Sequence, residues 1–378
     1  MQSKLPHVGT TIFTVMSALS NEHKAVNLGQ GFPDFPMDPE LIRMVNKAMN
    51  ENFNQYTHMF GFAPLREKLA SKINELYHRH IDFEKEITIT PGATYALFTA
   101  ISTFIHEGDE VIAFEPAYDC YKPAVELHKG KYIGINLKED FSIPWAQLRE
   151  KINSKTRAII INTPHNPSGY VWTKEDIKEL ENCTRNTKIL VISDEVYEHL
   201  IFDGLKHESV IKSDELYQRS IACYSFGKTY HCTGWKIGYA VANAELMSEF
   251  RKVHQFNAFC VDTPKQVAIA QYIDLKEAYL NLGSVVQEKR DYFRSLMKSS
   301  KFIPIHSHGS YFECYRYDAI SDLSDKDFAV KLVSEYGVAA IPVSAFYSNS
   351  QDSKMLRFCF AKSNQTLEKA VERLIKVQ

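Results

Sequence analysis

Cysteine is scarce in this sequence and shows no pairing pattern. The seven cysteines among 378 residues are scattered, and none is followed by another at CxxC spacing. They are Cys120, Cys183, Cys223, Cys232, Cys260, Cys314 and Cys359. Disulfide frameworks use even numbers of cysteines, and structural zinc sites use closely spaced pairs. We therefore expect reduced thiols, no metal site and a cytoplasmic location.

Net charge and long apolar runs are also nearly absent. Lysine and arginine together number 44 and aspartate and glutamate 46, so the formal net charge is −2. This balance gives no electrostatic basis for binding nucleic acid or an anionic membrane surface. No run approaches the roughly 18 apolar residues of a membrane span, and the opening MQSKLPHVGT has no apolar core of a secretory signal. We expect neither nucleic acid nor a membrane among the partners.

One lysine stands in an uncommon setting. Lys228 lies in SFGKTYHCTGWKIGY, directly after the apolar run Ile221–Tyr224, which predicts a short buried strand. A lysine that loses solvent, or has a second cation such as Lys236 nearby, has its pKa lowered from about 10.4 towards neutrality. The neutral amine can then attack a carbonyl and form a Schiff base. This stretch by itself is explained equally well by a solvated loop lysine.

Strand-like and helix-like segments alternate along much of the chain, as in parallel βαβ units. The predicted strands are residues 86–90, 110–114, 157–162, 189–193 and 221–224, and helices are predicted around 12–19, at 40–50, from 64, from 93 and at 174–182. The glycines and prolines of residues 26–38 predict no regular element there. In such α/β proteins ligands bind at the carboxyl ends of the strands, so the residues that follow each strand are expected to lie together.

The first three of these strand ends carry an anion site, an aromatic ring and a neutral amide. Gly92, Ala93 and Thr94 open a helix directly after a strand, which presents free N–H groups to an anion. The absence of GxGxxG and of a Walker lysine favours a single phosphate over a nucleotide. Tyr118 follows the next strand and could stack on a flat ligand, and the rigid turn TPHNPSG places Asn166 at the third.

The remaining strand ends carry a carboxylate and the lysine. Asp194 ends an apolar strand, where a carboxylate needs a partner to offset its desolvation, and Tyr197 follows three residues later. Together with Lys228, the five strand ends fit a phosphorylated aromatic aldehyde with a protonatable ring nitrogen. Pyridoxal 5'-phosphate is such a molecule.

At this point the chain resembles the fold-type I pyridoxal-phosphate-dependent aminotransferases of class I and II. The resemblance rests on NLGQGFPDF, NQYTHMFG, NTPHNPSG, ISDEVYE, SFGKTYHCTGWKIGY and the late arginine in LRFCFAK, and is strongest to the methionine and kynurenine aminotransferase branch. It implies an α/β fold. Residues 29–272 would form a large domain with a mostly parallel seven-stranded sheet between helices. Residues 273–378 would form a small α+β domain, beside which residues 1–28 pack as an arm and a helix.

The resemblance also implies roles around the cofactor. Lys228 would bond to the aldehyde of pyridoxal phosphate and later act as the base, and Asp194 would pair with its ring nitrogen. Tyr197 and Asn166 would bind the phenolic oxygen, and Tyr118 would stack on the ring. The phosphate would be held by Ala93, Thr94, Ser225 and Lys236, and by Tyr56 of a second subunit, which implies a homodimer with shared active sites.

For the substrate, the resemblance implies that Arg357 grips the α-carboxylate, with help from Asn166 and the backbone of Gly31. The side-chain pocket is expected to be apolar, with walls from Phe13, Tyr56, Tyr95, Phe259 and the segment around Cys260. No second arginine stands out to bind a distal carboxylate. Two departures, Phe13 for tryptophan and Thr94 for tyrosine, weaken a kynurenine preference, and Lys236 replaces the arginine of many relatives outside this branch.

These expectations lead to an aminotransferase that moves the amino group of methionine, or of an aromatic or apolar amino acid, to a 2-keto acid. A kynurenine aminotransferase or a cysteine-conjugate carbon–sulfur β-lyase on the same scaffold is the alternative, and a binding protein without turnover is a third. In the small domain a single long helix is expected at 277–299, strands around 309–317, 337–347 and 356–360, and a last helix at 366–377.

Overall fold

The computed structural model describes residues 2–378, and its centre is a seven-stranded sheet. Its strands, in spatial order, are β2 (Ile87–Thr90), β8 (Gly238–Ala242), β7 (Ser220–Ser225), β6 (Leu190–Asp194), β5 (Thr156–Asn162), β3 (Glu110–Glu115) and β4 (Lys131–Asn136). Among these seven strands β8 alone runs in the opposite direction to the other six. The predicted α/β fold with a mostly parallel sheet is thus confirmed. All five strands expected in this region are present to within a residue or two, and β4 and β8 are additional.

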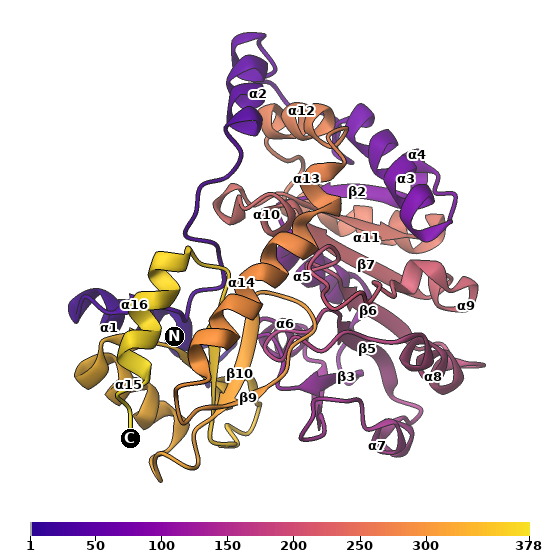
Figure 1. Ribbon diagram of the computed structural model, residues 1–378. Helices are drawn as coiled ribbons and strands as arrows, with labels where there is room; N and C mark the ends of the chain where they lie inside the picture. The colour runs from indigo at the N-terminus through magenta and orange to yellow at the C-terminus, as the bar shows by residue number, and fades with distance from the viewer. Residues whose placement is uncertain (1) are drawn as a thin grey trace.

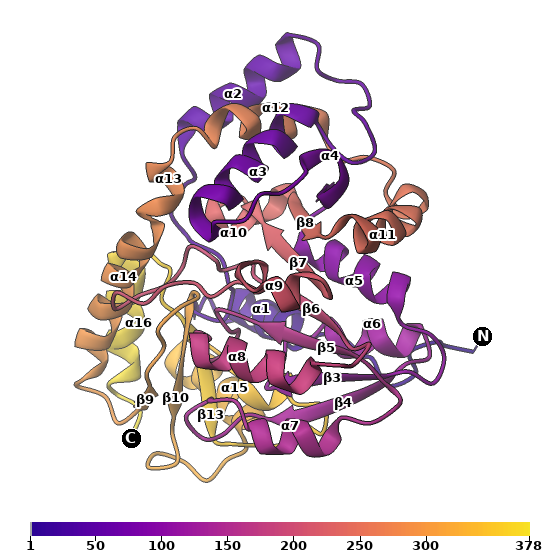
Figure 2. The ribbon, with the colours of Figure 1, turned by 90° about the vertical axis from the view of Figure 1, so that its right-hand side faces the viewer.

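Side chains alternate between the two faces of the sheet along each strand, and both faces are apolar and buried. In β5, Ile159 and Ile161 belong to one hydrophobic cluster, whereas Ala158 and Ile160 belong to another on the opposite face. Figure 2 shows α5 and α6 on one side of the sheet and α7 and α8 on the other. Continuous apolar strands of this kind are typical of parallel sheets covered by helices.

Helices connect these strands and begin at sequence signals. Thr173 and Asp176 form a capping box at the start of α8. Proline stands in the first turn of α2 and α3. The helices of this part are α2 (Pro39–Asn50), α3 (Ala63–Tyr77), α4 (Phe83–Glu86), α5 (Ala93–Phe104), α6 (Tyr121–Leu127), α7 (Trp145–Lys151), α8 (Lys174–Thr184), α9 (Asp214–Tyr217), α10 (Phe226–Thr229), α11 (Ala244–Asn257) and α12 (Thr263–Tyr272).

The two ends of the chain form a second layered unit. It contains an antiparallel sheet of β12 (Ile341–Pro342), β13 (Met355–Cys359), β10 (Phe312–Arg316) and β9 (Ile303–Ile305), with helices α1 (Ile12–Glu22), α15 (Asp325–Tyr336) and α16 (Asn364–Leu374). Met16 and Leu28 share a hydrophobic cluster with this unit, and α1 lies beside α15 (Figure 1). The domain boundaries after residues 28 and 272 remain predictions.

Two sequence-based expectations are wrong in detail. Residues 26–38 do contain a regular element, because β1 (Val26–Asn27) pairs in parallel with β11 (Val338–Ala339). The helix expected at 277–299 is two helices, α13 (Glu277–Leu280) and α14 (Leu282–Met297). They separate next to Gly283, which packs so closely on the backbone that a Cβ would lie 2.7 Å from the Ile201 carbonyl oxygen. Both differences from the expected structure therefore result from contacts between segments that are distant in sequence.

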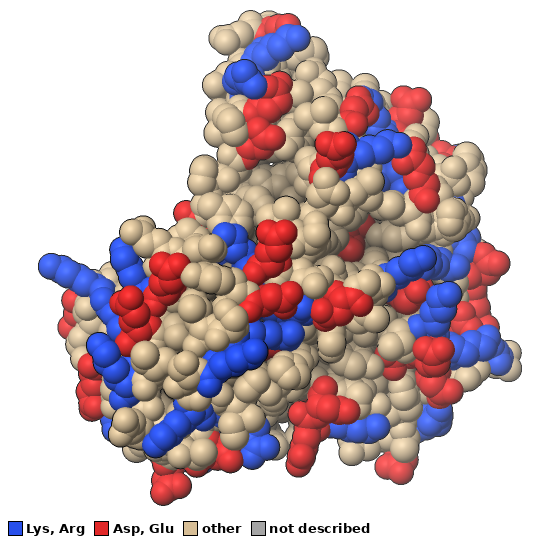
Figure 3. Space-filling view, in the orientation of Figure 1, with Lys and Arg blue, Asp and Glu red and all other residues tan. Residues whose placement is uncertain are grey.

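Charged side chains of both signs are interspersed over the face shown in Figure 3. Within residues 2–378 there is no helix with the length and apolar character needed to cross a membrane.

Candidate active site

A cavity of about 340 Å³ lies at the carboxyl edge of the central sheet, against β10 and β13 of the second unit. The elements that reach it are far apart in sequence, and the strand-end argument explains why they meet. Twelve residues predicted for the site line it: Phe13, Gly31, Ala93, Thr94, Tyr118, Asn166, Asp194, Tyr197, Ser225, Lys228, Lys236 and Arg357.

Lys228 lies in α10, immediately after β7, and is partly buried. Its Nζ donates a hydrogen bond of 2.7 Å to the Gly31 carbonyl oxygen and lies over the rings of Tyr197 and Tyr311. Burial lowers the pKa of this amine to about 8, and the nearby Arg357 guanidinium acts in the same direction. A lysine in this environment reaches the neutral, nucleophilic form far more readily than one in water.

Asp194 is the last residue of β6 and is buried. Its Oδ2 accepts a hydrogen bond of 2.6 Å from the Tyr121 hydroxyl, and its Oδ1 accepts a long one of 3.4 Å from the Val196 amide. Burial raises the pKa of this carboxyl group to about 6, although the Tyr121 hydrogen bond lowers it. The carboxylate therefore has unused capacity for a cationic donor.

The start of α5 provides a site for an anion. Gly92 caps the helix with φ of 80°, a left-handed conformation that suits glycine. A Cβ at Gly92 would lie 3.6 Å from the Lys236 Nζ, which places the ammonium group beside the helix N-terminus. Ser225 and Thr233 add hydroxyl groups to the same cavity. Free amides, a helix dipole and a lysine together suit a phosphate.

Arg357 projects from β13 and is 1% exposed. Its Nη1 donates to the Asn166 Oδ1 at 2.8 Å, and its Nη2 donates to the Gly29 carbonyl oxygen at 2.7 Å. The ring of Phe312 covers the guanidinium at 3.8 Å, and the Nε lacks a hydrogen-bond partner within the described residues. A buried guanidinium bonded only to neutral groups can accept a carboxylate as a two-pronged ligand.

The backbone of residues 29–31 contacts two of the cations that line the cavity. The help that the Gly31 backbone was expected to give in holding the substrate carboxylate stays a prediction. The carbonyl that accepts from Arg357 belongs to Gly29, whereas the Gly31 carbonyl accepts from Lys228. Gly31 does line the cavity. The Phe312 ring packs directly against Gly31 because this residue has no side chain. A Cβ there would lie 2.5 Å from Phe312 Cζ.

Three aromatic residues expected in the walls lie elsewhere. The Tyr95 hydroxyl donates to the His254 carbonyl oxygen, so this side chain lies toward α11, while Ala93, Thr94 and Leu97 take the cavity side of α5. Tyr56 is 81% exposed and contacts Phe259 edge to face. Tyr95 and Phe259 as walls of the cavity in the same chain are therefore wrong, and a reach of Tyr56 into a second subunit remains a prediction.

Sequence reasoning missed several residues that shape the site. Tyr121 was available, because it lies only three residues after Tyr118 and so belongs near the same strand end. Gln30 and Phe32 line the cavity from the glycine-rich segment, where only Gly31 was singled out. Phe312 had no signal, because its contact with Arg357 depends on the pairing of β10 with β13.

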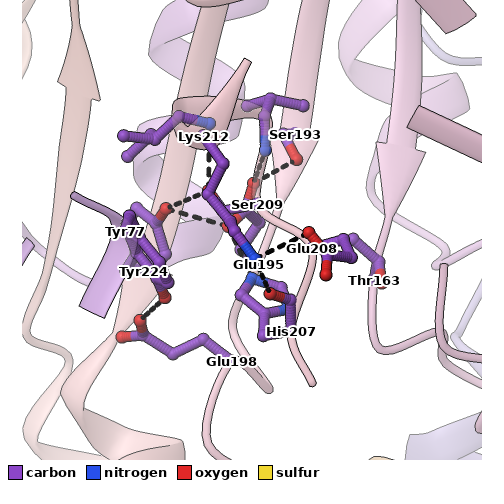
Figure 4. Close-up of polar contacts among 12 residues, drawn as sticks. Tyr77, Thr163, Ser193, Glu195, Glu198, His207, Glu208, Ser209, Lys212 and Tyr224 are labelled. Carbon is purple, nitrogen blue, oxygen red and sulfur yellow. Dashed lines mark hydrogen bonds and ion pairs between the residues drawn. The ribbon is translucent and has the colours of Figure 1, made fainter. Parts of the chain in front are cut away.

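Behind the sheet edge lies a second polar cluster that does not open into the cavity (Figure 4). Glu195 accepts hydrogen bonds from Ser193, His207 and Tyr224 at 2.8, 2.7 and 2.9 Å. Glu198 accepts from Lys72 at 2.6 Å and from Tyr239 at 3.0 Å, and also from Tyr77. Burial opposes ionisation of Glu198, but Lys72 and His199 outweigh it and hold the pKa well below its usual range.

Comparison with known proteins gives a consistent family. Residues 23–374 match the family described as aminotransferase class I and II. The methionine aminotransferase of Escherichia coli K12 is 44% identical over 375 residues, covering 99% of this chain and 97% of that protein. Human kynurenine–oxoglutarate transaminase 1 is 32% identical over 394 residues, covering 95% and 93%.

Solved structures agree over the whole chain. An Escherichia coli protein whose crystal structure and reactivity identified a methionine aminotransferase function has a TM-score of 0.97 at 44% identity, covering 100% of this chain and 99% of that one. The N-succinyldiaminopimelate aminotransferase of Mycobacterium tuberculosis has a TM-score of 0.96 at 34% identity, covering both chains completely.

Proposed function

The chain belongs to the class I and II aminotransferases, and from that premise we propose that it is a pyridoxal-phosphate enzyme acting on methionine and other apolar or aromatic amino acids. It would transfer the amino group to a 2-keto acid by a ping-pong sequence. The observation that carries the proposal is the pairing, in one cavity, of a lysine with lowered pKa and a buried carboxylate that lacks a cationic partner within the described residues.

The residues present fit pyridoxal phosphate. The N-terminus of α5 with Ala93 and Thr94, together with Ser225 and Lys236, suits the phosphate. Asp194, which lines the same cavity, suits a protonated ring nitrogen, and Tyr118 provides a ring for stacking. When bound, the cofactor supplies an aldehyde for the amine and a ring that withdraws electrons from the substrate.

Each protein group then has a defined task. Lys228 would hold the cofactor through its amine, and the same amine, when free, would take the proton from the substrate Cα. Asp194 would hold a proton on the ring nitrogen, and Tyr197 and Asn166 would bind the phenolic oxygen. Arg357 binds the α-carboxylate through the faces that Asn166 and Gly29 leave open.

The walls of the cavity favour an apolar side chain. Phe13, Phe32, Leu97, Tyr118 and Phe312 line it, and Arg357 is the one arginine that reaches it within residues 2–378. Since Arg357 serves the α-carboxylate common to all substrates, a distal carboxylate would be buried without a partner, which is costly. Aspartate and glutamate should therefore be poor donors. One methylene changes binding in such a pocket by only about 1–3 kcal/mol, so a broad preference is expected.

The substrate proposal is tested by a kcat/KM panel of methionine, phenylalanine, tyrosine, histidine, kynurenine and aspartate with a 2-keto acid acceptor. Methionine and the aromatic amino acids should lead. A faster reaction with aspartate would overturn the apolar pocket. A faster reaction with kynurenine would favour the second candidate, which the human relative supports. Release of pyruvate and ammonia from cysteine conjugates would reveal a β-lyase.

We also propose a homodimer with shared active sites. Tyr56 and Phe256 are 81% and 87% exposed, which is unusual for large aromatic side chains in a monomer and suits a subunit interface. Mixing Tyr56→Ala with Lys228→Ala should restore partial activity in hybrid dimers, because one site of each hybrid keeps both residues. Subunit exchange without any recovered activity would contradict a shared site. The cytoplasmic location stays a prediction from the cysteine pattern.

A further inference from the structure

We propose that Tyr121 is a positioning residue that aims the Asp194 carboxylate at the cofactor's ring nitrogen and sets how firmly that nitrogen keeps its proton. The inference rests on the proposed function, because it concerns the same site. It assigns a role to a side chain that neither touches the substrate nor lines the main cavity.

The geometry carries the inference. The Tyr121 hydroxyl donates to the Asp194 Oδ2 at 2.6 Å, and the other contact of the carboxylate is the 3.4 Å bond to the Val196 amide. One oxygen is thus fixed by a strong hydrogen bond, and the second is held only weakly. A donor to one oxygen fixes the plane of the carboxyl group, so the oxygen that meets the ligand is determined before binding.

The neutrality of the donor matters as much as its position. Asp194 has no ion pair with a lysine, arginine or histidine within 4.0 Å among the described residues, in contrast to Glu198, which Lys72 neutralises at 2.6 Å. A phenol orients the carboxylate without cancelling its charge. The charge therefore remains available for a protonated ring nitrogen, whereas a lysine at this place would compete for it.

Tyr121 is itself well held. It is 3% exposed, begins α6, and packs edge to face on Tyr118 with ring centroids 5.9 Å apart. Burial raises the pKa of its hydroxyl well above the usual value, so it stays a donor throughout the working pH range. The short segment from Tyr118 to the start of α6 thus carries both the Tyr118 ring and the hydroxyl group that orients Asp194.

The test compares holoenzymes of wild type, Tyr121→Phe and a matched control, Tyr170→Phe. Tyr170 also donates to a carboxylate, the Asp176 Oδ2 at 2.8 Å, but lies outside the main cavity. The readouts are the ¹⁵N resonance of the bound cofactor's ring nitrogen and the dissociation constants of pyridoxal phosphate and of an analogue with carbon in place of that nitrogen. Unfolding midpoints of the cofactor-free proteins check that all variants fold.

In Tyr121→Phe the ring-nitrogen resonance should move toward the unprotonated value, and cofactor affinity should fall about tenfold, in the range for one hydrogen bond to a charged group. Affinity for the carbon analogue should stay at the wild-type level, and Tyr170→Phe should change neither readout. An unchanged resonance, or an equal loss of affinity for cofactor and analogue, would overturn the inference. If the wild type itself fails to bind pyridoxal phosphate, the proposed function fails as well, so the two failures are distinguishable.

Discussion

Asp194 and Glu198 lie four residues apart at the same edge of the central sheet, and their surroundings are opposite. Asp194 faces the cavity with one short hydrogen bond, from a neutral phenol, and burial raises its pKa to about 6. Glu198 faces the interior with Lys72, Tyr77 and Tyr239 around it, and its pKa lies well below the usual range.

The difference separates a carboxylate kept for a ligand from one used for the fold. Buried charges are stable when hydrogen-bonded and paired, and the protein meets this requirement fully for Glu198. Asp194 is hydrogen-bonded but has no cationic partner among the described residues, so a ligand in the cavity would have to supply one. The same contrast holds for the cations. Lys72 lies 2.6 Å from a carboxylate, whereas Lys228, among residues 2–378, donates only to a backbone carbonyl.

The largest effect is expected on the cavity side at Lys228. Lys228→Ala removes both the attachment point and the base, so transamination should fall by several orders of magnitude while the protein stays folded. The measurement is single-turnover amino-group transfer with saturating cofactor. In wild type, borohydride should link the cofactor irreversibly to the peptide that contains Lys228. Substantial turnover by the variant would show that another residue serves as the base.

The next largest effect is expected from Asp194→Asn. An amide cannot stabilise a proton on the ring nitrogen as a carboxylate does, so Cα deprotonation should slow on the order of 10²–10⁴-fold. Hydrogen exchange of substrate Cα with solvent measures this step directly. Near-native exchange with saturating cofactor would show that Asp194 does not serve the ring.

On the far side of the sheet the expected effect is on stability. Lys72→Met leaves Glu198 charged and buried without its cation, which should lower the free energy of unfolding by about 3–5 kcal/mol. Denaturant unfolding of the cofactor-free protein measures it, and Tyr77→Phe is the milder control at about 1–3 kcal/mol. The kcat of the molecules that remain folded should stay close to wild type. A large loss of kcat with unchanged stability would show that the Lys72–Glu198 pair serves the reaction and not the fold.

The smallest effect is a gain of stability in the cofactor-free protein. The lowering of the Lys228 pKa from 10.5 to about 8 corresponds to about 3 kcal/mol. Because the folded pKa lies below the unfolded one, the unfolded state binds more protons between these values, so wild-type stability should rise with pH from about 8 to 10.5. Lys228→Met should be more stable by up to that amount below pH 8, and the gain should vanish above 10.5. Chemical unfolding of both proteins across this pH range provides the check. A stability difference between variant and wild type that does not change with pH would show that the Lys228 pKa is not its cause.

Much of the cavity side could be predicted from sequence because its residues follow apolar strands directly. An aspartate at the end of such a strand and a lysine at the end of another are local signals, and a parallel sheet brings them together. The far side had no comparable signal. Lys72 meets Glu198 across 126 residues, and Tyr239 reaches it from β8, a strand that the sequence did not predict.

The wall residues show a related limit. Tyr95 was expected among the aromatic walls of the cavity, but the helical rotation of α5 turns it toward α11. The break between α13 and α14 likewise depends on Gly283 meeting the backbone of Ile201. Neither contact is contained in local periodicity.

The packing around Gly31 limits which substitutions the protein can tolerate at this position. A single added methyl group there would lie 2.5 Å from Phe312 Cζ, and Phe312 is the ring that covers the Arg357 guanidinium at 3.8 Å. Displacing that ring would open Arg357 to water and disturb the carbonyl that holds Lys228 at 2.7 Å. Mutational tolerance should therefore be as low at this residue without a side chain as at the charged groups around it, and a saturation library of position 31 should return glycine almost exclusively.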